Sequence, residues 1–437
     1  MIMNPKLPEA FVSRMERQLG NELPAFLRAL EEPPVRGIRL NTLKATRATE
    51  PYRRGPRIPW AEEAYELPAD SDAGSTILHE AGAFYLQEPG AMLPACVLNA
   101  RPGERILDLC AAPGGKATQA GIAMRGKGLL VCNEPVPKRA RILSGNIERI
   151  GLPHTVVTCA LPEQLAEKWP EAFDAVMADV PCSGEGMFRR VPESRTEWSK
   201  EQARGCAQRQ REILDQAAKL VRPGGRLVYS TCTYNPEENE KNADWFLKEH
   251  SEYEPEAFSV GGIDAPDGRC TCYPHRMRTE GQFAACFRKK GNEKEPLPED
   301  RSLPKPGKEE ATALAAAFPD LFPATHRFGN TLVRLAECPD LQGIRVLRVG
   351  LHLGEIRGRA AIPDHAAAMS IEPPKTPVLD LDAHDACRYL AGETIVADRE
   401  GWLLIRYKGL ILGWGKGSGG IVRNHYPKGL RGNHYLP

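Results

Sequence analysis

The sequence predicts an α/β protein whose centre is a mostly parallel, doubly wound sheet. Between residues 76 and 290, short β-branched and apolar runs alternate with segments of helical periodicity, which is typical of repeated βαβ units. A glycine-rich turn follows the first run, and carboxylate or thiol side chains end or follow the second, fourth and fifth. Ligands bind at the carboxyl ends of strands in open parallel sheets, so this pattern also predicts where a functional site lies.

Five segments are predicted strands of this sheet: 104–110, 128–134, 155–158, 173–179 and 225–231. Helices are expected near 117–124, 136–150, 161–169 and 202–221. In the last of these, apolar residues recur at helical spacing on one face. Asn235, Pro236 and Glu238 resemble an N-cap, a first-turn proline and a capping-box acid, and predict a further helix directly after Cys232.

The flanking segments predict additional units. The segment GNEKEPLPEDRSLPKPGK is charged, proline-rich and without apolar periodicity, which indicates a linker. The expected division is a small N-terminal RNA-binding domain (1–75), a catalytic domain (76–290), the linker (291–308), a small C-terminal domain (309–375) and a basic C-terminal domain (380–437).

Composition excludes several classes of protein. The chain has 437 residues with 58 Lys and Arg against 57 Asp and Glu, so its net charge of +1 favours no partner. Its 12 cysteines are too sparse for a small disulfide scaffold. The N-terminus lacks the basic flank and apolar core of a signal peptide, and no apolar run is long enough to span a membrane. We expect a cytoplasmic protein with reduced thiols.

The C-terminal segment departs from this charge balance. Residues 401–437 contain no acid and six cations: Arg406, Lys408, Lys416, Arg423, Lys428 and Arg431. Aromatic residues are interleaved with them: Trp402, Tyr407, Trp414, Tyr426 and Tyr435. Cations bind phosphates and rings can stack on bases, so the pattern favours RNA binding over a merely solvated basic surface.

A cofactor site is predicted where the first strand turns into a helix, at Asp108-Leu-Cys-Ala-Ala-Pro-Gly-Gly-Lys116. A helix N-terminus favours a carboxylate or another oxygen-rich group, and Gly114 and Gly115 permit its close approach. The spacing fits neither a dinucleotide fingerprint nor a P-loop. Glu134 ends the second strand, where an acid accepts hydrogen bonds from ribose hydroxyls; the alternative is a solvated helix-capping acid. Together these features fit S-adenosylmethionine.

Two cysteines follow neighbouring strands at the same edge. Cys182 lies in Asp179-Val-Pro-Cys-Ser-Gly-Glu-Gly after the fourth strand, and Cys232 lies in Ser-Thr-Cys-Thr after the fifth. A lone buried cysteine usually serves as a small apolar residue. Two thiols at one ligand-binding edge instead indicate that the cysteines take part in catalysis.

At these residues the sequence resembles the Nol/Nop/Sun family of RNA cytosine-5 methyltransferases. The three motifs above and Tyr85-Leu-Gln-Glu88 carry the resemblance, which spans about 36–290. The basic tail is similar to the C-terminal RNA-binding unit of bacterial small-subunit ribosomal RNA methyltransferases of the F type. The resemblance implies an S-adenosylmethionine-dependent methyltransferase fold and a PUA-like C-terminal domain. It also implies RNA, with ribosomal RNA the expected partner. Separately, we expect no membrane association and a monomer.

The resemblance also implies roles for individual residues. Cys232 would be the nucleophile that adds to carbon 6 of cytosine and so activates carbon 5. Cys182 would serve proton removal or product release, and Asp179 would lie between cofactor and base with Lys116 close by. The implied cofactor residues are Cys110, Ala111, Ala112, Pro113, Gly114, Gly115, Lys116, Glu134 and Asp179. No metal is expected.

Some features remain open at this stage. The family often has an acid after the third strand that contacts the adenine amine, and Leu161 aligns there. Arg189 and Arg190 could grip phosphates or form a solvated pair. Four residues could hold zinc, but their spacing fits no common site: Cys270, Cys272, His275 and Cys286. The rival functions are a DNA cytosine-5 methyltransferase, which the Thr-Cys232 thiol and the basic tail disfavour, a transfer-RNA methyltransferase, and a non-catalytic RNA-binding ribosome-assembly factor.

Overall fold

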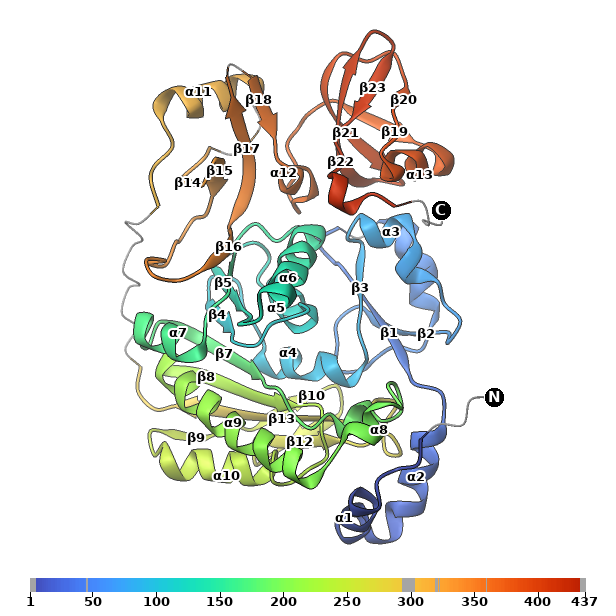
Figure 1. The fold of residues 1–437 in the computed structure, drawn as a ribbon, viewed down its shortest axis with the longest axis vertical. Coiled ribbons are helices and arrows are strands. Elements are labelled where there is room, and N and C mark those ends of the chain that lie inside the picture. Colours follow the sequence, from blue (N-terminus) through green and yellow to red (C-terminus); the bar gives the residue numbers. More distant parts are fainter. Residues whose placement is uncertain are drawn as a thin grey trace.

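The fold is known from a computed structural model that describes residues 5–44, 46–292, 303–318, 321, 323–358 and 360–432. Most of the predicted linker 291–308 lies outside these ranges, as does Tyr435. The described chain forms an elongated molecule, with the N-terminal helices at one end and the C-terminal units at the other (Figure 1).

A nine-stranded sheet forms the centre of the described chain, in the order β12-β13-β8-β7-β4-β5-β6-β16, with β9 also paired to β13. Its five inner strands are parallel and confirm the five predicted segments. They are β4 (Arg105–Asp108), β5 (Leu129–Asn133), β6 (Thr155–Thr158), β7 (Phe173–Asp179) and β8 (Val221–Thr231). The outer strands are antiparallel: β9 (Tyr253–Pro255), β12 (Arg269–Cys272), β13 (Gln282–Lys289) and β16 (Val346–Val349).

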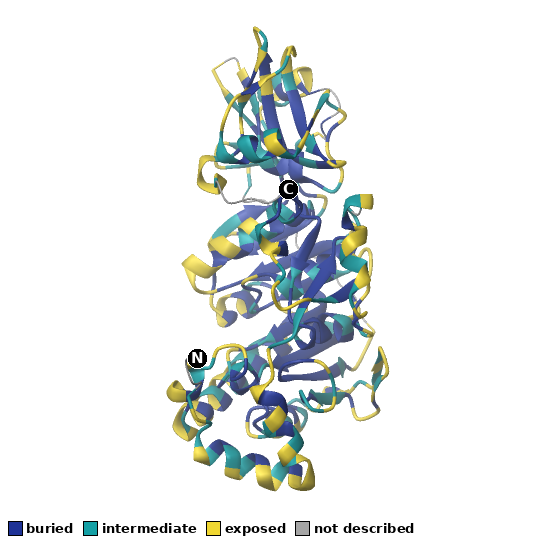
Figure 2. Ribbon diagram, turned by 90° about the vertical axis from the view of Figure 1, so that its right-hand side faces the viewer, coloured by how far each residue is buried: buried dark blue, intermediate teal, exposed yellow. Residues whose placement is uncertain are grey.

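Helices cover both faces of this sheet, as a doubly wound fold requires. One face packs against α4 (Leu93–Leu98), α5 (Gly115–Ala123) and α6 (Pro137–Ile150). The other packs against α7 (Pro162–Lys168), α9 (Lys200–Leu220) and α10 (Glu240–Glu249). Neighbouring residues such as Ile106 and Leu107 belong to opposite cores, because successive side chains of a strand point to opposite faces. Figure 2 shows the buried strands running through the interior.

The helix expected directly after Cys232 begins later, at Glu240. Residues 236–239 form a turn, in which the Asn235 carbonyl accepts from the N–H groups of Glu238 and Asn239. The Glu238 carboxylate binds Ser183 and Gln210 rather than acting as a capping-box acid. The capping-box prediction is wrong because tertiary partners occupy this buried carboxylate.

The N-terminal segment combines helices with a small sheet. Its elements are α1 (Glu9–Leu19), α2 (Leu23–Glu31), β1 (Arg36–Leu40), β2 (Ala64–Leu67), α3 (Ile77–Glu80) and β3 (Phe84–Leu86). The strand order is β2-β1-β3, so this sheet crosses the boundary predicted at residue 75. Phe11 and Phe26 pack with Phe188, Trp198 and Tyr234. The first two helices therefore support the loop that follows β7, together with the short helix α8 (Ser194–Glu197).

The C-terminal part contains two further sheets. The first, in the order β14-β15-β17-β18, contains β14 (His326–Phe328), β15 (Thr331–Arg334), β17 (Leu351–Arg357) and β18 (Ala360–Pro363), with α11 (Lys308–Ala317) and α12 (His365–Met369) beside it. The second, in the order β19-β21-β22-β23-β20, contains β19 (Val378–Leu381), β20 (Ile395–Val396), β21 (Gly401–Tyr407), β22 (Leu410–Ser418) and β23 (Ile421–Asn424), with α13 (Ala383–Ala391). A separate hairpin joins β10 (Phe258–Val260) and β11 (Ile263–Ala265).

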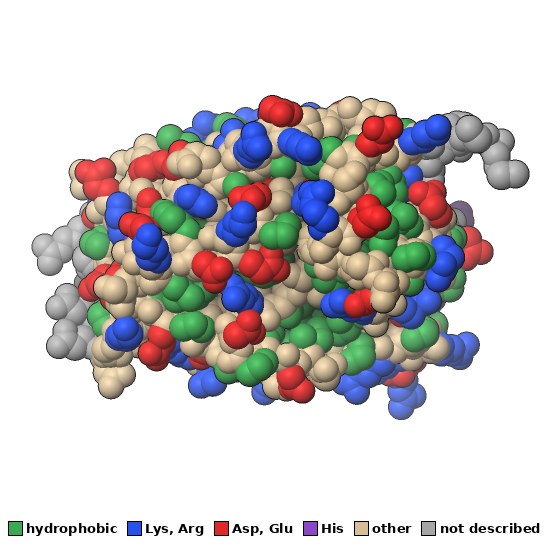
Figure 3. Space-filling model, turned by 90° about the horizontal axis from the view of Figure 1, so that it is seen from below, with side chains coloured by type: hydrophobic (Ala, Val, Ile, Leu, Met, Phe, Trp, Pro, Cys, Tyr) green, Lys and Arg blue, Asp and Glu red, His purple; other side chains and the backbone are tan. Residues whose placement is uncertain are grey.

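The C-terminal part is anchored to the rest of the chain. Strand β16, from the predicted unit 309–375, adds antiparallel to β6 of the central sheet. Leu403 and Tyr407 share a core with Ile38 and Phe84 of the N-terminal sheet. No helix in the described ranges is both long and apolar enough to cross a membrane. Acids and bases are interspersed on the face seen in Figure 3.

The Arg14–Glu185 ion pair joins α1 to the loop after β7 and predicts a stability effect. Arg14 binds the fully buried Glu185 carboxylate at 2.6 Å. Arg14→Met leaves that charge without its cation, and should lower the free energy of unfolding by about 2–3 kcal/mol. Urea titration followed by tryptophan fluorescence measures this loss, because Trp198 donates to the same carboxylate. Arg17→Met, on the exposed side of α1, is the matched control; equal stability of the two variants contradicts the assignment.

Candidate active site

The carboxylates and thiols predicted at the strand ends meet at one edge of the sheet. Asp108 ends β4 and Asp179 ends β7, and these strands are neighbours. Cys232 directly follows β8, which pairs with β7. A cavity of about 290 Å³ opens there. Its walls include Tyr85, Gln87, Asp108, Cys110, Ala111, Ala112, Pro113, Gly115, Lys116, Asp179, Arg190, Cys232 and Gln282.

The two thiols are in direct contact. The Sγ atoms of Cys182 and Cys232 lie 3.1 Å apart, and the backbone N–H of Cys232 donates to Cys182 Sγ at 3.3 Å. The hydrogen bond with Cys232, and then burial, raise the pKa of Cys182 well above its usual range. Cys182 therefore stays a protonated thiol, while Cys232 lines the cavity.

Glu238 ties together the two loops that carry these thiols. Its carboxylate accepts from the backbone N–H of Ser183 and from Gln210 Nε2, each at 2.9 Å. Ser183 Oγ also contacts Thr233 Oγ1 at 3.0 Å. Burial raises the pKa of Glu238. Each loop is thus fixed to the other one residue beyond its cysteine.

Asp179 is held by two donors at the cavity wall. Lys116 Nζ lies 2.7 Å from Asp179 Oδ2, and Ser230 Oγ donates to Oδ1 at 2.6 Å. Burial disfavours the Lys116 ammonium, but the charge of Asp179 outweighs it and raises the pKa of Lys116. An ammonium and a carboxylate therefore stand side by side next to Cys232, as the resemblance implied.

The glycine-rich turn offers an open helix N-terminus. No side chain caps α5, so its first backbone N–H groups are available to a ligand. Gly114 has φ +117°, a conformation that side chains rarely adopt. A Cβ on Gly115 would lie 3.1 Å from Gln87 and 3.3 Å from Tyr85. The Tyr85-Leu-Gln-Glu88 segment thus packs directly on the turn and shapes it.

Glu88 and Glu280 form a buried hydrogen-bond network at the cavity wall, and the sequence did not predict this network. The Glu88 carboxylate accepts backbone N–H bonds from Gly90, Ala91 and Glu280. Arg189 is buried and paired with Glu280 at 2.8 Å, so neither interpretation of Arg189, as a phosphate contact or a solvated cation, is correct. Arg190 is exposed and lines the cavity, where it remains available to a phosphate.

Glu134 and Leu161 lie beside the turn. Glu134 is 1% exposed, accepts the Val136 N–H at 2.9 Å and pairs with Arg139 at 3.0 Å. It is therefore buried rather than solvated, and its contact with a ribose stays a prediction. Leu161 is exposed, and its N–H donates to Gln164 Oε1. Leu161 itself therefore offers no carboxylate to an adenine amine.

Asp108, at the end of β4, is a buried acid beside the glycine-rich turn. It is 1% exposed, and neither carboxylate oxygen accepts a hydrogen bond from the described residues. Burial, and then the charge of Asp179, raise its pKa to about 8. S-adenosylmethionine carries an ammonium next to its carboxylate. An unpaired acid beside an open helix N-terminus fits that pair of groups, so the residues present suit this cofactor.

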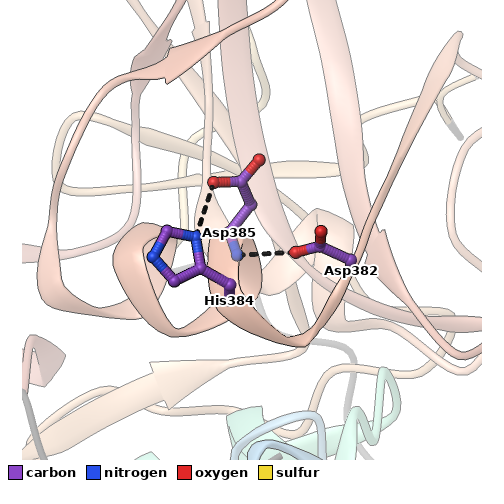
Figure 4. A group of neighbouring side chains, drawn as sticks. All are labelled: Asp382, His384 and Asp385. Atoms are coloured by element: carbon purple, nitrogen blue, oxygen red, sulfur yellow. Dashed lines mark hydrogen bonds and ion pairs between the residues drawn. The ribbon is translucent and has the colours of Figure 1, made fainter.

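The suggested zinc ligands do not converge. His275 pairs with Glu22 at 2.9 Å, and Cys286 Sγ contacts Glu256. In the described ranges one other group, Asp382, His384 and Asp385, has the spacing of a metal site (Figure 4). Asp382 Oδ1 caps the N–H of Asp385, and Asp385 pairs with Arg388. These surface residues therefore cap and stabilise the N-terminus of α13.

The fold and the site together define a class. The protein is an S-adenosylmethionine-dependent RNA methyltransferase. Its doubly wound sheet carries the open glycine turn, a buried acid after β5 and two thiols after β7 and β8. The chain belongs to the 16S rRNA methyltransferase RsmB/F family, whose profile matches residues 95–288. Profiles of the RsmF N-terminal domain (7–89), first C-terminal domain (312–371) and PUA domain (376–432) match the flanking segments.

Curated relatives extend over nearly the whole chain. It is 32% identical to "Ribosomal RNA small subunit methyltransferase F" of Klebsiella pneumoniae, over 97% of this chain and 96% of that protein. The Enterobacter protein of the same name is 31% identical over 97% and 95%. A methyltransferase homologue from Pyrococcus horikoshii has 28% identity and a TM-score of 0.56, covering 64% of this chain and 95% of its own. NSun6 from the same organism, solved with SFG, shares the fold at 22% identity and TM-score 0.57, over 65% and 99%.

Asp108 predicts a proton release on cofactor binding. At pH 6.5 the free carboxyl is protonated, because its pKa is about 8. A bound ammonium favours the charged form, so binding should release close to one proton and affinity should rise from pH 6 to 7.5. Calorimetry in two buffers of different ionisation enthalpy measures the release. Asp108→Asn should abolish it; a release that survives in this variant contradicts the role.

Proposed function

We propose that this protein methylates carbon 5 of a cytosine in small-subunit ribosomal RNA through a covalent adduct with Cys232. The observation that carries the proposal is the contact of two thiols at 3.1 Å, one of them lining a cavity with Lys116 and Asp179. The family and the relatives support ribosomal RNA as the substrate. Such a substrate implies action in the cytoplasm, and we expect a monomer.

Cys232 begins the reaction. Its thiolate adds to carbon 6, which gives carbon 5 the electron density to attack a methyl group. Lys116 interacts electrostatically with Cys232 and Asp179, and so stabilises negative charge at the sulfur and along the base. Bound S-adenosylmethionine supplies the electrophilic methyl group. The base must leave its stack to enter the cavity, because carbon 6 is inaccessible inside a helix.

Cys182 completes the reaction. The proton on carbon 5 must leave before the bond between Cys232 and carbon 6 can break. Cys182 touches Cys232 Sγ and keeps its own proton, so it is placed to protonate the Cys232 thiolate as it departs. A protonated thiol cannot take the proton from carbon 5, so a base other than Cys182 accepts that proton. This assignment also separates the protein from enzymes in which the Pro-Cys thiol is the nucleophile.

The C-terminal sheet supplies candidate RNA contacts, but fewer than the sequence suggested. Tyr407, Trp414 and Tyr426 are buried and cannot stack on bases. Arg406 is paired with Asp380 at 2.6 Å. Lys416 and Arg423 face each other across β22 and β23 and are exposed. Two like charges in cross-strand contact are unfavourable without an anion, which supports a phosphate between them.

Replacement of the nucleophile tests the proposal. Cys232→Ala should abolish methyl transfer and leave cofactor affinity within about threefold, because the thiol attacks the base. Bisulfite sequencing of total RNA from a deletion strain complemented with wild type or variant locates the modified cytosine. Turnover near the wild-type rate in a single-turnover assay rejects the role of Cys232. Tight cofactor and RNA binding by wild type without turnover would instead support the assembly-factor alternative.

Removal of the second thiol should trap the intermediate. Cys182→Ala should accumulate a covalent protein–RNA adduct, because addition and methylation precede the step that it blocks. The adduct appears as a slow band on a denaturing gel. It should vanish in the Cys182→Ala/Cys232→Ala double variant; a band that persists there means that the thiol roles are assigned wrongly.

The exposed cation pair predicts the salt dependence of RNA binding. Removal of residues 380–437 would expose the shared cores, so point substitutions are the cleaner test. Lys416→Gln/Arg423→Gln should weaken RNA binding and reduce the salt slope by about 1.4–1.8, the loss of two phosphate contacts. Arg406→Gln is the matched control, because Asp380 already pairs with Arg406. An unchanged slope in the double variant shows that this surface is only solvated.

A further inference from the structure

Gln282 lies on the face of the sheet that carries Asp179. Strand β13 runs antiparallel to β8, with Ala284 opposite Ser230. Ala284, Val228 and Met177 belong to one core. Because side chains two apart along a strand share a face, Gln282, Ser230 and Asp179 continue that face to the edge. Gln282 is 1% exposed and lines the same cavity as Cys232.

The Gln282 amide is weakly engaged by the protein. Its one side-chain hydrogen bond in the described ranges is from Nε2 to Asp179 Oδ1, at 3.5 Å. This distance is at the upper limit for a hydrogen bond. The other donors to Asp179, Ser230 Oγ and Lys116 Nζ, lie at 2.6 and 2.7 Å. An almost fully buried amide with one weak partner, at the wall of a cavity, is suited to bind what enters the cavity.

The groups around Gln282 complement one edge of a cytosine. That edge presents a donor at N4 and acceptors at N3 and O2. The Asp179 carboxylate can accept from N4, while the Lys116 ammonium and an amide N–H can donate to N3 and O2. Uracil has a carbonyl in place of the amine and would face the carboxylate unfavourably. Addition of a thiolate at carbon 6 moves negative charge toward N3 and O2, so a donor there acts most strongly in the transition state.

We propose that Gln282 is a substrate-binding residue that donates its amide N–H to the O2 carbonyl of the target cytosine. The inference rests on the proposed function, because it takes a cytosine as the base beside Cys232. It adds a third group to the carboxylate and ammonium that hold the base edge. It also gives β13, an antiparallel strand outside the predicted parallel set, a part in the site.

Conservative substitution tests the donor. Gln282→Met keeps the length of the side chain and removes the hydrogen bonds; the single-turnover rate of methyl transfer should fall about tenfold to a hundredfold, with cofactor affinity unchanged. Gln282→Glu keeps the shape but places a second carboxylate beside Asp179, and should fall further. In the Cys182→Ala background, Gln282→Met should slow adduct formation by the same factor. Gln119→Met, on α5 and outside this cavity, is the matched control.

The results separate the inference from the proposed function. If Gln282→Met transfers methyl groups within threefold of wild type, or loses cofactor affinity in parallel with rate, the inference is overturned and Cys232 chemistry stands. If Cys232→Ala remains active, the proposed function itself fails. Should the Gln282 variants unfold, wild-type enzyme with 2-thiocytidine at the mapped target provides the test. Its weak acceptor should slow transfer about tenfold, and an unchanged rate overturns the inference.

Discussion

The site depends on one constraint, the fixed separation of two loops that leave neighbouring parallel strands. β7 and β8 pair in register up to Asp179 and Ser230, which brings the residues after them to the same edge. Glu238, in the loop after β8, accepts a hydrogen bond from Ser183 in the loop after β7. This bond holds the two thiols in contact. A small shift of either loop would break the 3.1 Å contact between the two sulfur atoms, so Glu238 maintains the geometry of Cys182 and Cys232.

The rest of the chain surrounds this edge. The N-terminal helices support the loop after β7 through Arg14 and the aromatic cluster around Phe11 and Phe188. The segment from Tyr85 to Glu88 packs on the glycine turn and on Glu280. The C-terminal sheet shares a core with the N-terminal one. The flanking units are therefore parts of a single scaffold with the central sheet.

Electrostatics divides the work within the cavity. Lys116 and Asp179 form an ion pair at 2.7 Å, and the charge of Asp179 raises the pKa of Lys116 against the effect of its burial. Asp108 is 1% exposed, its carboxylate has no cation as a hydrogen-bond partner in the described ranges, and burial raises its pKa to about 8. The same edge therefore holds an ion pair and, on the neighbouring strand β4, a carboxyl with a raised pKa.

Local periodicity and motif spacing encode the parallel core, its five strands and the edge at which the functional residues gather, so these features were predictable without the structure. The sequence also indicated the glycine turn, Glu134 and the two thiols. Features that depend on contacts between distant segments became evident in the folded chain alone. The Glu238 carboxylate binds Ser183 instead of forming the predicted capping box. Arg189 is buried and paired with Glu280, and three aromatic residues of the C-terminal segment lie in the core. The pairing of β16 with β6 and the contact of Gln282 with Asp179 have the same origin. Burial and long-range pairing outweigh local preference, and the two partners of such a contact do not lie together in any short window of sequence.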